Sequence, residues 1–335
     1  ERTVIPIDLT RSATICDINE DGHLDLVFGS QKKGQLATIF YGDGSRNYSL
    51  DNSYQLQNSQ GTGGPGVADL NRDGLLDIAF AHNSNVLVYY QEADHIFNEP
   101  IKLSDQAKTM TIADVNSDGW LDLVCPYYKG SGRRSWYSTI YLGSENGYDK
   151  SNVIQLPTDG GTGSLVSDFN RDGYQDVLFY CHRKDGSYDE IKNYGDHNTN
   201  SRLYWGGKNG FSKENYTKIP GVGVHYDMGV DIGKINNRSQ FFEYESSNYN
   251  LRNKIPKKLT WNDELDDGNN IKFQIRFADT IEELETSEWC GPKGNNTYYT
   301  KNNPKINYKS GEWMQYKTIF DIGNGSQVPI LDKVE

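Results

Sequence analysis

The sequence has few methionines and cysteines, with three Met and four Cys among 335 residues. The cysteines, Cys16, Cys125, Cys181 and Cys290, are too few and too scattered to form a disulfide framework or a zinc motif. We expect them to be buried free thiols or to form one bridge at most. No apolar run reaches the roughly 18 residues that a membrane-spanning helix needs, so no membrane span is expected.

Basic residues are also in deficit. Lys and Arg number 34 against 46 Asp and Glu, which gives a formal net charge of −12. This balance argues against nucleic acid or an anionic membrane as a partner. Tyrosine and glycine are abundant, with 23 and 34 residues, and this composition favours strands and turns over helices.

One acidic nonapeptide occurs four times. The pattern D-x-N-x-D-G-x-x-D occupies residues 17–25, 69–77, 114–122 and 168–176. Ca²⁺ takes six to eight oxygen ligands, and alternate positions of a tight loop direct side-chain oxygens at one point. The glycine at position six permits the sharp turn, because a residue without Cβ reaches positive φ at little cost. The spacing of about fifty residues indicates a structural repeat.

The nonapeptide predicts about four structural calcium ions. In an EF-hand a glutamate closes the loop at position twelve, whereas this position is Phe28, Phe80, Cys125 or Phe179 here, with β-prone residues around it. We therefore expect each loop to join two strands. The expected side-chain ligands are Asp17, Asn19, Asp21, Asp25, Asp69, Asn71, Asp73, Asp77, Asp114, Asn116, Asp118, Asp122, Asp168, Asn170, Asp172 and Asp176. The expected carbonyl ligands, at position seven, are His23, Leu75, Trp120 and Tyr174.

Each repeat reads as four short antiparallel strands, which is the pattern of a propeller blade. A fifth, degenerate unit at about 217–250 has Asp231, Gly233, Ile235 and Ser239 where ligands are expected, so we predict no calcium there. Blade-like strands are expected within it at residues 228–232 and 240–245. Residues 4–9 are expected to close the wheel by completing its last blade.

The repeat ends near residue 251. Residues 257–261, 271–278, 297–300, 313–320 and 328–334 alternate as strands, and residues 281–284 form a helical turn. We therefore predict an all-β chain with a five-bladed propeller at 1–252 and a β-sandwich at 253–335.

The four loops, each followed by an apolar strand, resemble the FG-GAP/VCBS repeats of integrin-α-like β-propellers. This resemblance covers residues 3 to about 250. Residues 156–161 and 204–211 are similar to a bacterial secreted branch that often carries a C-terminal β-sandwich, which residues 311–316 also suggest. The resemblance implies an extracellular, calcium-stabilised propeller for adhesion, glycan binding or polysaccharide breakdown. Because many members have seven blades, either the predicted count of five is wrong or the chain is a piece of a longer parent.

We expect binding residues in the variable loops, because function concentrates in loops carried by a rigid frame. Two long loops, 126–138 and 181–202, carry aromatic rings and guanidinium groups that suit acidic sugars through stacking and bidentate hydrogen bonds. The alternative is that these are ordinary loop residues. The candidates are Tyr127, Tyr128, Arg133, Arg134, Trp136, His182, Arg183, Tyr188, Tyr194 and His197.

Three functions remain open on the sequence. The first is a non-catalytic module that binds glycans or protein partners, because no nucleophile motif stands apart from the metal loops. The second is a polysaccharide lyase or an accessory protein of polysaccharide degradation. Tyr180 with His182, or His225 with Tyr226, would then perform acid–base chemistry. The third is a structural subunit of an extracellular filament or surface layer.

Calcium sites of this kind fill at the calcium concentration outside cells, so we expect a secreted or cell-surface protein. Its partners would be a glycan or an extracellular protein, with self-association or further domains of a longer parent as alternatives. Five N-x-S/T sequons are glycosylation candidates: Asn47, Asn215, Asn237, Asn295 and Asn324.

Overall fold

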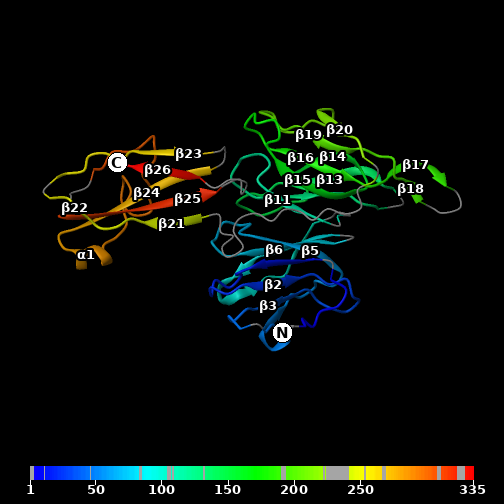
Figure 1. Ribbon diagram of the computed structural model, residues 1–335, viewed down its shortest axis with the longest axis horizontal. Coiled ribbons are helices and arrows are strands. Elements are labelled where there is room, and N and C mark those ends of the chain that lie inside the picture. The colour runs from blue at the N-terminus through cyan, green and yellow to red at the C-terminus, as the bar shows by residue number, and fades with distance from the viewer. Residues whose placement is uncertain are drawn as a thin grey trace. The chain divides into compact units, whose positions relative to one another are not determined.

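The computed structural model describes residues 4–10, 12–45, 47–82, 85–103, 107, 109–130, 133–189, 194–221, 223, 241–252, 254–265, 269–307, 311–322 and 329–335. The chain divides into two compact units (Figure 1). The first is Glu1–Ser239, and the second comprises Gln240–Gly323 and Gln327–Glu335. No helix among the described residues is long and apolar enough to span a membrane.

The described residues of the first unit form four antiparallel sheets of four strands, and each sheet is a blade. Blade 1 comprises β1 (Ala13–Cys16), β2 (Asp25–Phe28), β3 (Thr38–Phe40) and β4 (Ser53–Gln55). Blade 2 comprises β5 (Thr62–Ala68), β6 (Asp77–His82), β7 (Val86–Tyr89) and β10 (Ile101–Leu103). Blade 3 comprises β11 (Thr111–Ala113), β12 (Asp122–Cys125), β13 (Ser135–Tyr141) and β14 (Val153–Asp159). Blade 4 comprises β15 (Gly161–Ser167), β16 (Asp176–Cys181), β19 (Ser201–Tyr204) and β20 (Tyr216–Ile219).

Short elements extend three of the blades. Blade 1 carries the 3₁₀ turn η1 (Leu50–Asn52) before its last strand. Blade 2 carries the paired strands β8 (Gln91–Glu92) and β9 (Ile96–Phe97), with η2 (Ala93–His95) between them. Blade 4 carries the hairpin of β17 (Lys184–Asp189) and β18 (Tyr194–Asp196), which occupies the long 181–202 connection.

Neighbouring blades pack face to face through apolar clusters. Between blades 1 and 2, for example, Ile18 and Val27 of blade 1 share a buried cluster with Ile78 and Phe80 of blade 2. Similar clusters join blade 2 to blade 3 and blade 3 to blade 4. We call the face that packs on the following blade the forward face, and the one that packs on the preceding blade the rear face. The alternation of side chains along each strand supplies both faces.

The described residues contain four blades, and most of the predicted fifth unit, residues 222 and 224–240, lies outside them. The strand predicted at 240–245 exists as β21 (Phe241–Glu245), but it pairs with β25 (Trp313–Ile322) of the second unit. An alternating strand fits any sheet that offers a free edge, and here the free edge is that of β25. The domain boundary therefore lies near residue 240 rather than 252. The predicted strand at 228–232, with Asp231, Gly233, Ile235 and Ser239, lies outside the described residues.

The N-terminal segment does not close the wheel, because residues 4–9 form no strand. Val4 and Leu9 are exposed. The Leu9 carbonyl instead accepts a hydrogen bond from Gln31 N at 3.1 Å, and Lys32 pairs with Asp8. The segment is therefore attached to a loop of blade 1.

The second unit contains two sheets with one core. In the larger sheet, β25 pairs with β21, with β22 (Tyr249–Asn250) and with β24 (Asn269–Ala278). The smaller sheet pairs β23 (Trp261–Glu264) with β26 (Ile330–Val334), and α1 (Ile281–Thr286) is the short predicted helix. Trp261 from one sheet packs against Phe273 from the other, as in a β-sandwich. The strand predicted at 297–300 is reduced to isolated bridges of Tyr299 and Thr300.

A glycine follows the third strand in blades 1, 3 and 4 because the backbone passes very close to the acidic loop there. A Cβ on Gly206 would lie 2.1 Å from the Gln175 carbonyl oxygen, and one on Gly42 or Gly143 would lie 2.3 Å from the corresponding carbonyl. The neighbouring Gly207 has no atom within 4 Å of such a Cβ. Packing therefore requires glycine at positions 42, 143 and 206, but not at 207.

We expect Gly206→Ala to lower the free energy of unfolding by roughly 1–3 kcal/mol, because the backbone must move to admit the methyl group. Gly207→Ala is the matched control and should change it by less than about 0.5 kcal/mol. Urea unfolding of both variants measures the difference. Equal effects would contradict the close approach of Gly206 to Gln175.

Candidate functional site

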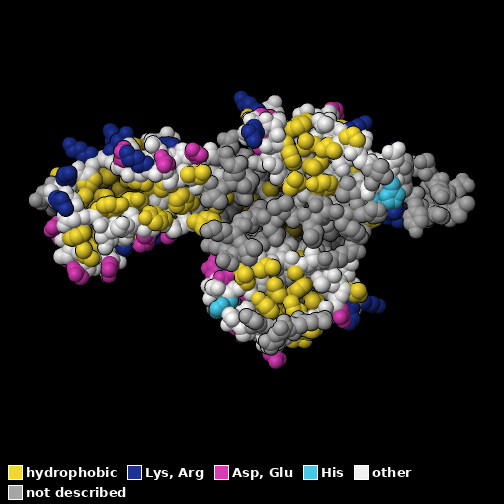
Figure 2. Space-filling view, in the orientation of Figure 1, with side chains coloured by type: hydrophobic (Ala, Val, Ile, Leu, Met, Phe, Trp, Pro, Cys, Tyr) yellow, Lys and Arg dark blue, Asp and Glu magenta, His cyan; other side chains and the backbone are white. Residues whose placement is uncertain are grey.

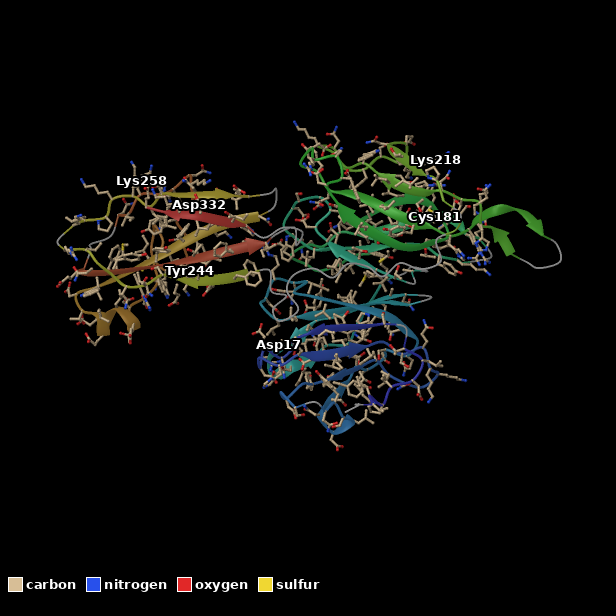
Figure 3. All side chains as sticks on the ribbon, in the orientation of Figure 1. Asp17, Cys181, Lys218, Tyr244, Lys258 and Asp332 are labelled. Carbon is tan, nitrogen blue, oxygen red and sulfur yellow. The ribbon has the colours of Figure 1, made fainter. Side chains whose placement is uncertain are left out.

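Each acidic nonapeptide connects the first two strands of a blade, as predicted. The loops join β1 to β2, β5 to β6, β11 to β12 and β15 to β16. Asp17, labelled in Figure 3, opens the first of them at the end of β1. The expected strand–loop–strand context is therefore confirmed, and the four loops lie at equivalent positions of four blades.

The first and fifth residues of each loop are held by its own backbone. In the second loop, Asp69 accepts hydrogen bonds from the N–H groups of Asp73 at 3.1 Å and Gly74 at 3.0 Å. Asn71 Oδ1 also accepts from Asp73 N, at 3.0 Å, while Asn71 Nδ2 donates to Asp73 Oδ2 at 2.8 Å. Asp73 Oδ1 accepts from Leu75 N at 2.8 Å. The other three loops repeat these contacts at corresponding residues.

The ninth residue fastens the loop to the rest of its blade. Asp77 accepts a hydrogen bond from Leu70 N inside the loop and another from Gln91 N beyond the third strand, both at 2.8 Å. Asp25, Asp122 and Asp176 bind their own loops and the glycine after the third strand in the same way. One carboxylate thus crosslinks three parts of the blade.

The loop backbone is the same in all four copies. The glycine at position six has φ between +87° and +94°. Position four is also left-handed, although no glycine is present there: the φ values are +56° at Glu20, +63° at Arg72, +58° at Ser117 and +60° at Arg171. Such values are uncommon for these residue types, so the hydrogen bonds of the loop maintain them against local strain.

Several carboxyl groups of these loops, including all four at position nine, have raised pKa values, chiefly because they are buried. Burial raises the pKa of Asp77 to about 8 and that of Asp25, Asp69 and Asp114 to about 6. For Asp77, the negative charges of Asp69 and Asp73 add to the effect of burial, while the N–H groups of Gln91 and Leu70 oppose it. A bound cation would favour the ionised form of these groups.

The donor chemistry of the loops suits calcium. Each loop gathers hard carboxylate and amide oxygens with excess negative charge, and this is the ligand set that Ca²⁺ prefers. Within the described part of the chain, however, no three His, Cys, Asp or Glu side chains are placed so that together they would hold a metal ion. The aspartates are turned instead toward backbone N–H groups.

Neighbouring loops also contact each other. Arg72 of the second loop donates from Nη1 to the Gly119 carbonyl of the third loop at 3.1 Å. Its guanidinium lies 5.6 Å from the centre of the Trp120 ring. The second and third loops are thus joined by an arginine that the sequence pattern did not single out.

The predicted binding residues separate into two groups, and those of the first are buried or half-buried. His182 is buried and stacks on Tyr128, with ring centres 6.0 Å apart and an angle of 8°. His197 lies edge-on to His182 at 4.7 Å, and Arg134 lies 4.9 Å from the centre of the Tyr128 ring. Tyr127 is also buried, and its hydroxyl donates to the Gly130 carbonyl at 2.9 Å. This group packs the 126–138 loop against the residues that follow β16.

The second group is exposed. The side chain of Trp136 on β13 is 44% exposed, and the Arg133 guanidinium lies 5.3 Å from the centre of its ring. Tyr137 lies edge-on to Trp136 at 5.7 Å, and Lys213 Nζ is 4.8 Å from the centre of the Tyr137 ring. Arg133, Trp136, Tyr137 and Lys213 form what we call the aromatic platform.

Asp185 of β17 supports the platform. Its carboxylate accepts hydrogen bonds from Arg134 N at 2.8 Å and Ser135 N at 3.1 Å, and its own N–H donates to Ser135 Oγ at 2.9 Å. The sequence analysis did not single out Asp185, Tyr137 or Lys213, although Tyr137 and Asp185 lie within the two long loops that it named. The side chains of Tyr188 and Tyr194 lie outside the described residues, and Arg183 is half-buried beside Gly160.

The remaining predicted residues are the glycosylation candidates and the proposed lyase residues. Among the sequons, Asn47, Asn215 and Asn295 are exposed, while Asn237 and Asn324 lie outside the described residues. Asn295 donates to Glu288 Oε2 at 2.6 Å. His182, proposed as a lyase base with Tyr180, is too buried for a polymer to reach without rearrangement. His225 and Tyr226 lie outside the described residues.

The fold and the repeated loop define a class, namely repeat proteins built of four-stranded blades with an acidic loop in each. The FG-GAP-like repeat family matches the chain at residues 17–80, 69–125 and 114–179, which include all four loops. Over this region the chain belongs to the FG-GAP-like repeat proteins. No curated protein matches the chain.

The chain is similar to several solved structures. A lectin of Agrocybe aegerita, described as recognising non-reducing terminal N-acetylglucosamine, is 16% identical, with a TM-score of 0.40 over 62% of this chain and 52% of that one. The V. cholerae biofilm matrix protein Bap1 is 13% identical, with a TM-score of 0.35 over 92% and 52%. The GH43 protein BlXynB of Bacillus licheniformis is 9% identical, with a TM-score of 0.34 over 98% of both. The chain thus spans about half the length of the first two structures, and at these scores the likeness bears on no particular site.

The buried aspartates predict that, without calcium, the stability of the folded chain falls as the pH rises. Their pKa values are higher in the folded chain than the ordinary 3.8, so the folded state binds more protons than the unfolded state between about pH 4 and 8. Stability in chelator should then fall as the pH rises from 5 to 8. With calcium, which competes with protons for the same oxygens, stability should rise over this range.

Melting temperatures measured with EGTA and with calcium across this pH range check the expectation. Asp77→Asn should flatten the slope in chelator between about pH 6 and 8, whatever it does to overall stability, because it removes the group whose pKa is about 8. Parallel slopes in EGTA and in calcium would contradict the assignment.

Proposed function

We propose that this chain is an extracellular, non-catalytic binding module whose blades are stabilised by calcium in the four acidic loops. The aromatic platform would bind acidic glycans. The observation that carries the binding proposal is the exposed ring of Trp136 with Arg133 against it, on a loop fastened by Asp185. The proposed calcium ligands are the four sets of Asp and Asn at loop positions one, three, five and nine, with the position-seven carbonyl.

Calcium would neutralise the negative charge of aspartates that the fold buries away from water. Three aspartates converge on each loop, and those at position nine are fully buried. A divalent ion bound to such a loop offsets the cost of ionising them and strengthens the crosslink between the first two strands. We assign calcium a structural role, because its ligands are contained in the loop and the aromatic platform is built from other residues.

The platform has the chemistry of acidic-sugar recognition. A sugar ring stacks on an aromatic face, and guanidinium or ammonium groups bind its carboxylate or sulfate. Arg133 and Lys213 supply the two cations, and Trp136 and Tyr137 supply the rings. Strands β13 and β14 each have seven residues and extend beyond β12, so the rings stand on a stiff two-stranded extension of blade 3.

Removal of calcium should lower the melting temperature by many degrees. Each ion bound only by the folded state contributes about 2.7 kcal/mol when calcium is a hundredfold above its dissociation constant, and four sites act together. Differential scanning calorimetry with calcium and with excess EGTA measures the shift. Asp73→Ala should cause a smaller loss than EGTA, because three loops remain.

The exposed Asp51 lies outside the loops, so Asp51→Ala is the matched control and should keep the full calcium response. A melting curve that EGTA leaves unchanged would refute the structural role of calcium. Calcium titration by calorimetry would then show whether the loops bind at all.

Binding of acidic polysaccharides should depend on Trp136. We expect the full chain, in calcium, to bind heparin or polygalacturonate more tightly than neutral dextran, and to bind them less tightly as salt increases. Trp136→Ala together with Arg133→Gln should weaken binding by roughly tenfold, since both the stacking and the cation are lost. Isothermal titration calorimetry provides the measurement.

Tyr298→Ala removes a similarly exposed ring from the second unit and serves as the control. Equal losses in the platform and control variants would place binding elsewhere. Absence of saturable binding to any of the three polymers would refute the glycan proposal while leaving the calcium proposal intact.

A further inference from the structure

Two side chains connect the acidic loops of neighbouring blades, and the repeated pattern fixes neither of them. Arg72, at position four of the second loop, contacts the third loop. Gln91, which follows the third strand of blade 2, contacts the first loop. Acidic side chains are visible at the first loop in Figure 2, where Figure 3 labels Asp17. The second loop is therefore connected to the loop on either side of it.

Arg72 acts on a single peptide group of the third loop. Its Nη1 donates to the Gly119 carbonyl at 3.1 Å, and its guanidinium lies 5.6 Å from the centre of the Trp120 ring. The N–H of the same peptide group belongs to Trp120 and donates to Asp118 Oδ1 at 2.9 Å. Hydrogen bonds at both ends of one peptide group polarise and strengthen each other. Arg72 thus orients a peptide group that contacts one expected calcium ligand, Asp118, and directly precedes another, the Trp120 carbonyl.

The placement of this arginine depends on the second loop. Arg72 has a φ of +63°, which is uncommon for an arginine, and it lies between Asn71 and Asp73, two expected ligands of that loop. An ion held by Asn71 and Asp73 would fix the strained backbone between them. The guanidinium would then be held at the third loop before that loop has bound an ion of its own.

Gln91 connects the buried aspartates at position nine of the first two loops. Its main-chain N–H donates to Asp77 Oδ1 at 2.8 Å, and its side-chain Nε2 donates to the Ile18 carbonyl at 3.3 Å. The N–H of Ile18 donates in turn to Asp25 Oδ2 at 2.8 Å. A continuous chain of hydrogen bonds thus runs from Asp25 to Asp77. Gln91 is only 2% exposed, so water competes little for these bonds.

The third and fourth loops lack such connectors. Blades 3 and 4 have Gly143 and Gly206 at the position of Gln91, and a glycine has no side chain to extend. Position four of the third loop is Ser117, whose side chain is too short to make the contact of Arg72. Within the described residues, no hydrogen bond or ion pair joins the third loop to the fourth.

We propose that Arg72 and Gln91 are positioning residues through which the first three acidic loops bind calcium cooperatively, while the fourth loop binds it independently. The inference rests on the proposed calcium function and specifies which sites act together. An ion in the second loop would order the parts of the first and third loops that Gln91 and Arg72 contact, so the next ion would lose less conformational entropy on binding. Coupling of this kind is reciprocal and typically changes affinity by about 5–150-fold.

Terbium luminescence would report on the third loop by itself. Tb³⁺ takes hard oxygen ligands as Ca²⁺ does, and it emits when a nearby indole transfers energy to it. Trp120 is at position seven of the third loop, whereas the other loops have His23, Leu75 and Tyr174 there. Excitation at the red edge of the indole band should therefore reveal an ion in the third loop. Trp120→Phe should remove the signal, which assigns it.

Disabling the second loop should weaken binding at the third. We expect Asp73→Ala to raise the terbium midpoint of the Trp120 signal by about fivefold or more. Asp172→Ala, the same change in the fourth loop, is the matched control and should shift this midpoint by less than about twofold. In an Arg72→Ala background, Asp73→Ala should no longer shift the midpoint. Arg171→Ala removes an exposed arginine from position four of the fourth loop and should preserve the full dependence.

A second reporter tests the role of Gln91. His23 is exposed at position seven of the first loop, so His23→Trp combined with Trp120→Phe transfers the signal to that loop. Asp73→Ala should again raise the midpoint by about fivefold or more. Gln91→Gly, which introduces the residue that the other three blades have, should remove this dependence. Circular dichroism establishes that each variant folds.

The outcomes separate this inference from the proposed calcium function. A third-loop midpoint that Asp73→Ala leaves unchanged or lowers would overturn the inference while the calcium sites stand. Equal shifts in Asp73→Ala and Asp172→Ala would also overturn it, since the loops would then be coupled through the general stability of the fold. A dependence that survives Arg72→Ala would overturn the role of Arg72, because a purely structural arginine changes the midpoint but not its dependence on the second loop. Absence of any terbium signal that calcium displaces would refute the calcium sites themselves.

Discussion

The first unit depends on a buried aspartate that accepts hydrogen bonds from two distant parts of its blade. In each blade, the aspartate at position nine binds an N–H of its own loop and an N–H that follows the third strand. These bonds fix the loop, the second strand and the end of the third strand relative to one another. A carboxylate so placed is costly to ionise, and burial raises the pKa of Asp77 to about 8. The fold thus buries carboxyl groups whose ionised form a nearby cation would stabilise.

Stacking of the blades adds a second constraint. Every strand of a blade supplies side chains to two faces, and among the described residues blades 2 and 3 pack on a neighbouring blade through both. Phe169 and Ile15 show the consequence, because they are exposed where their counterparts in inner blades are buried. The platform of Trp136 and Arg133 lies apart from these faces, on the extended β13 strand. The exposed apolar side chains of blades 1 and 4 and the aromatic platform therefore occupy different parts of the unit.

The sequence predicted the repeating elements well and their partners poorly. The four loops, the strands beside them and the short helix near residue 281 lie where the local patterns placed them. The strand at 241–245 was also predicted, but it was assigned to the wrong sheet, because alternation shows that a strand has two faces and not which edge it joins. The predicted binding residues were likewise divided by packing: His182 is buried against Tyr128, whereas Trp136 is exposed.

The sequence alone determined the acidic loops, their spacing and the β character of the chain. These properties are local, since ligand types, a glycine at position six and alternating apolar residues act within a few positions of one another. Only the tertiary structure decided that Asp77 reaches Gln91, that Arg72 bridges two loops, that Asp185 supports the platform and that Phe169 is exposed. Each of these contacts joins segments whose proximity depends on how sheets pair and stack, and such long-range pairing leaves no pattern in the neighbouring sequence.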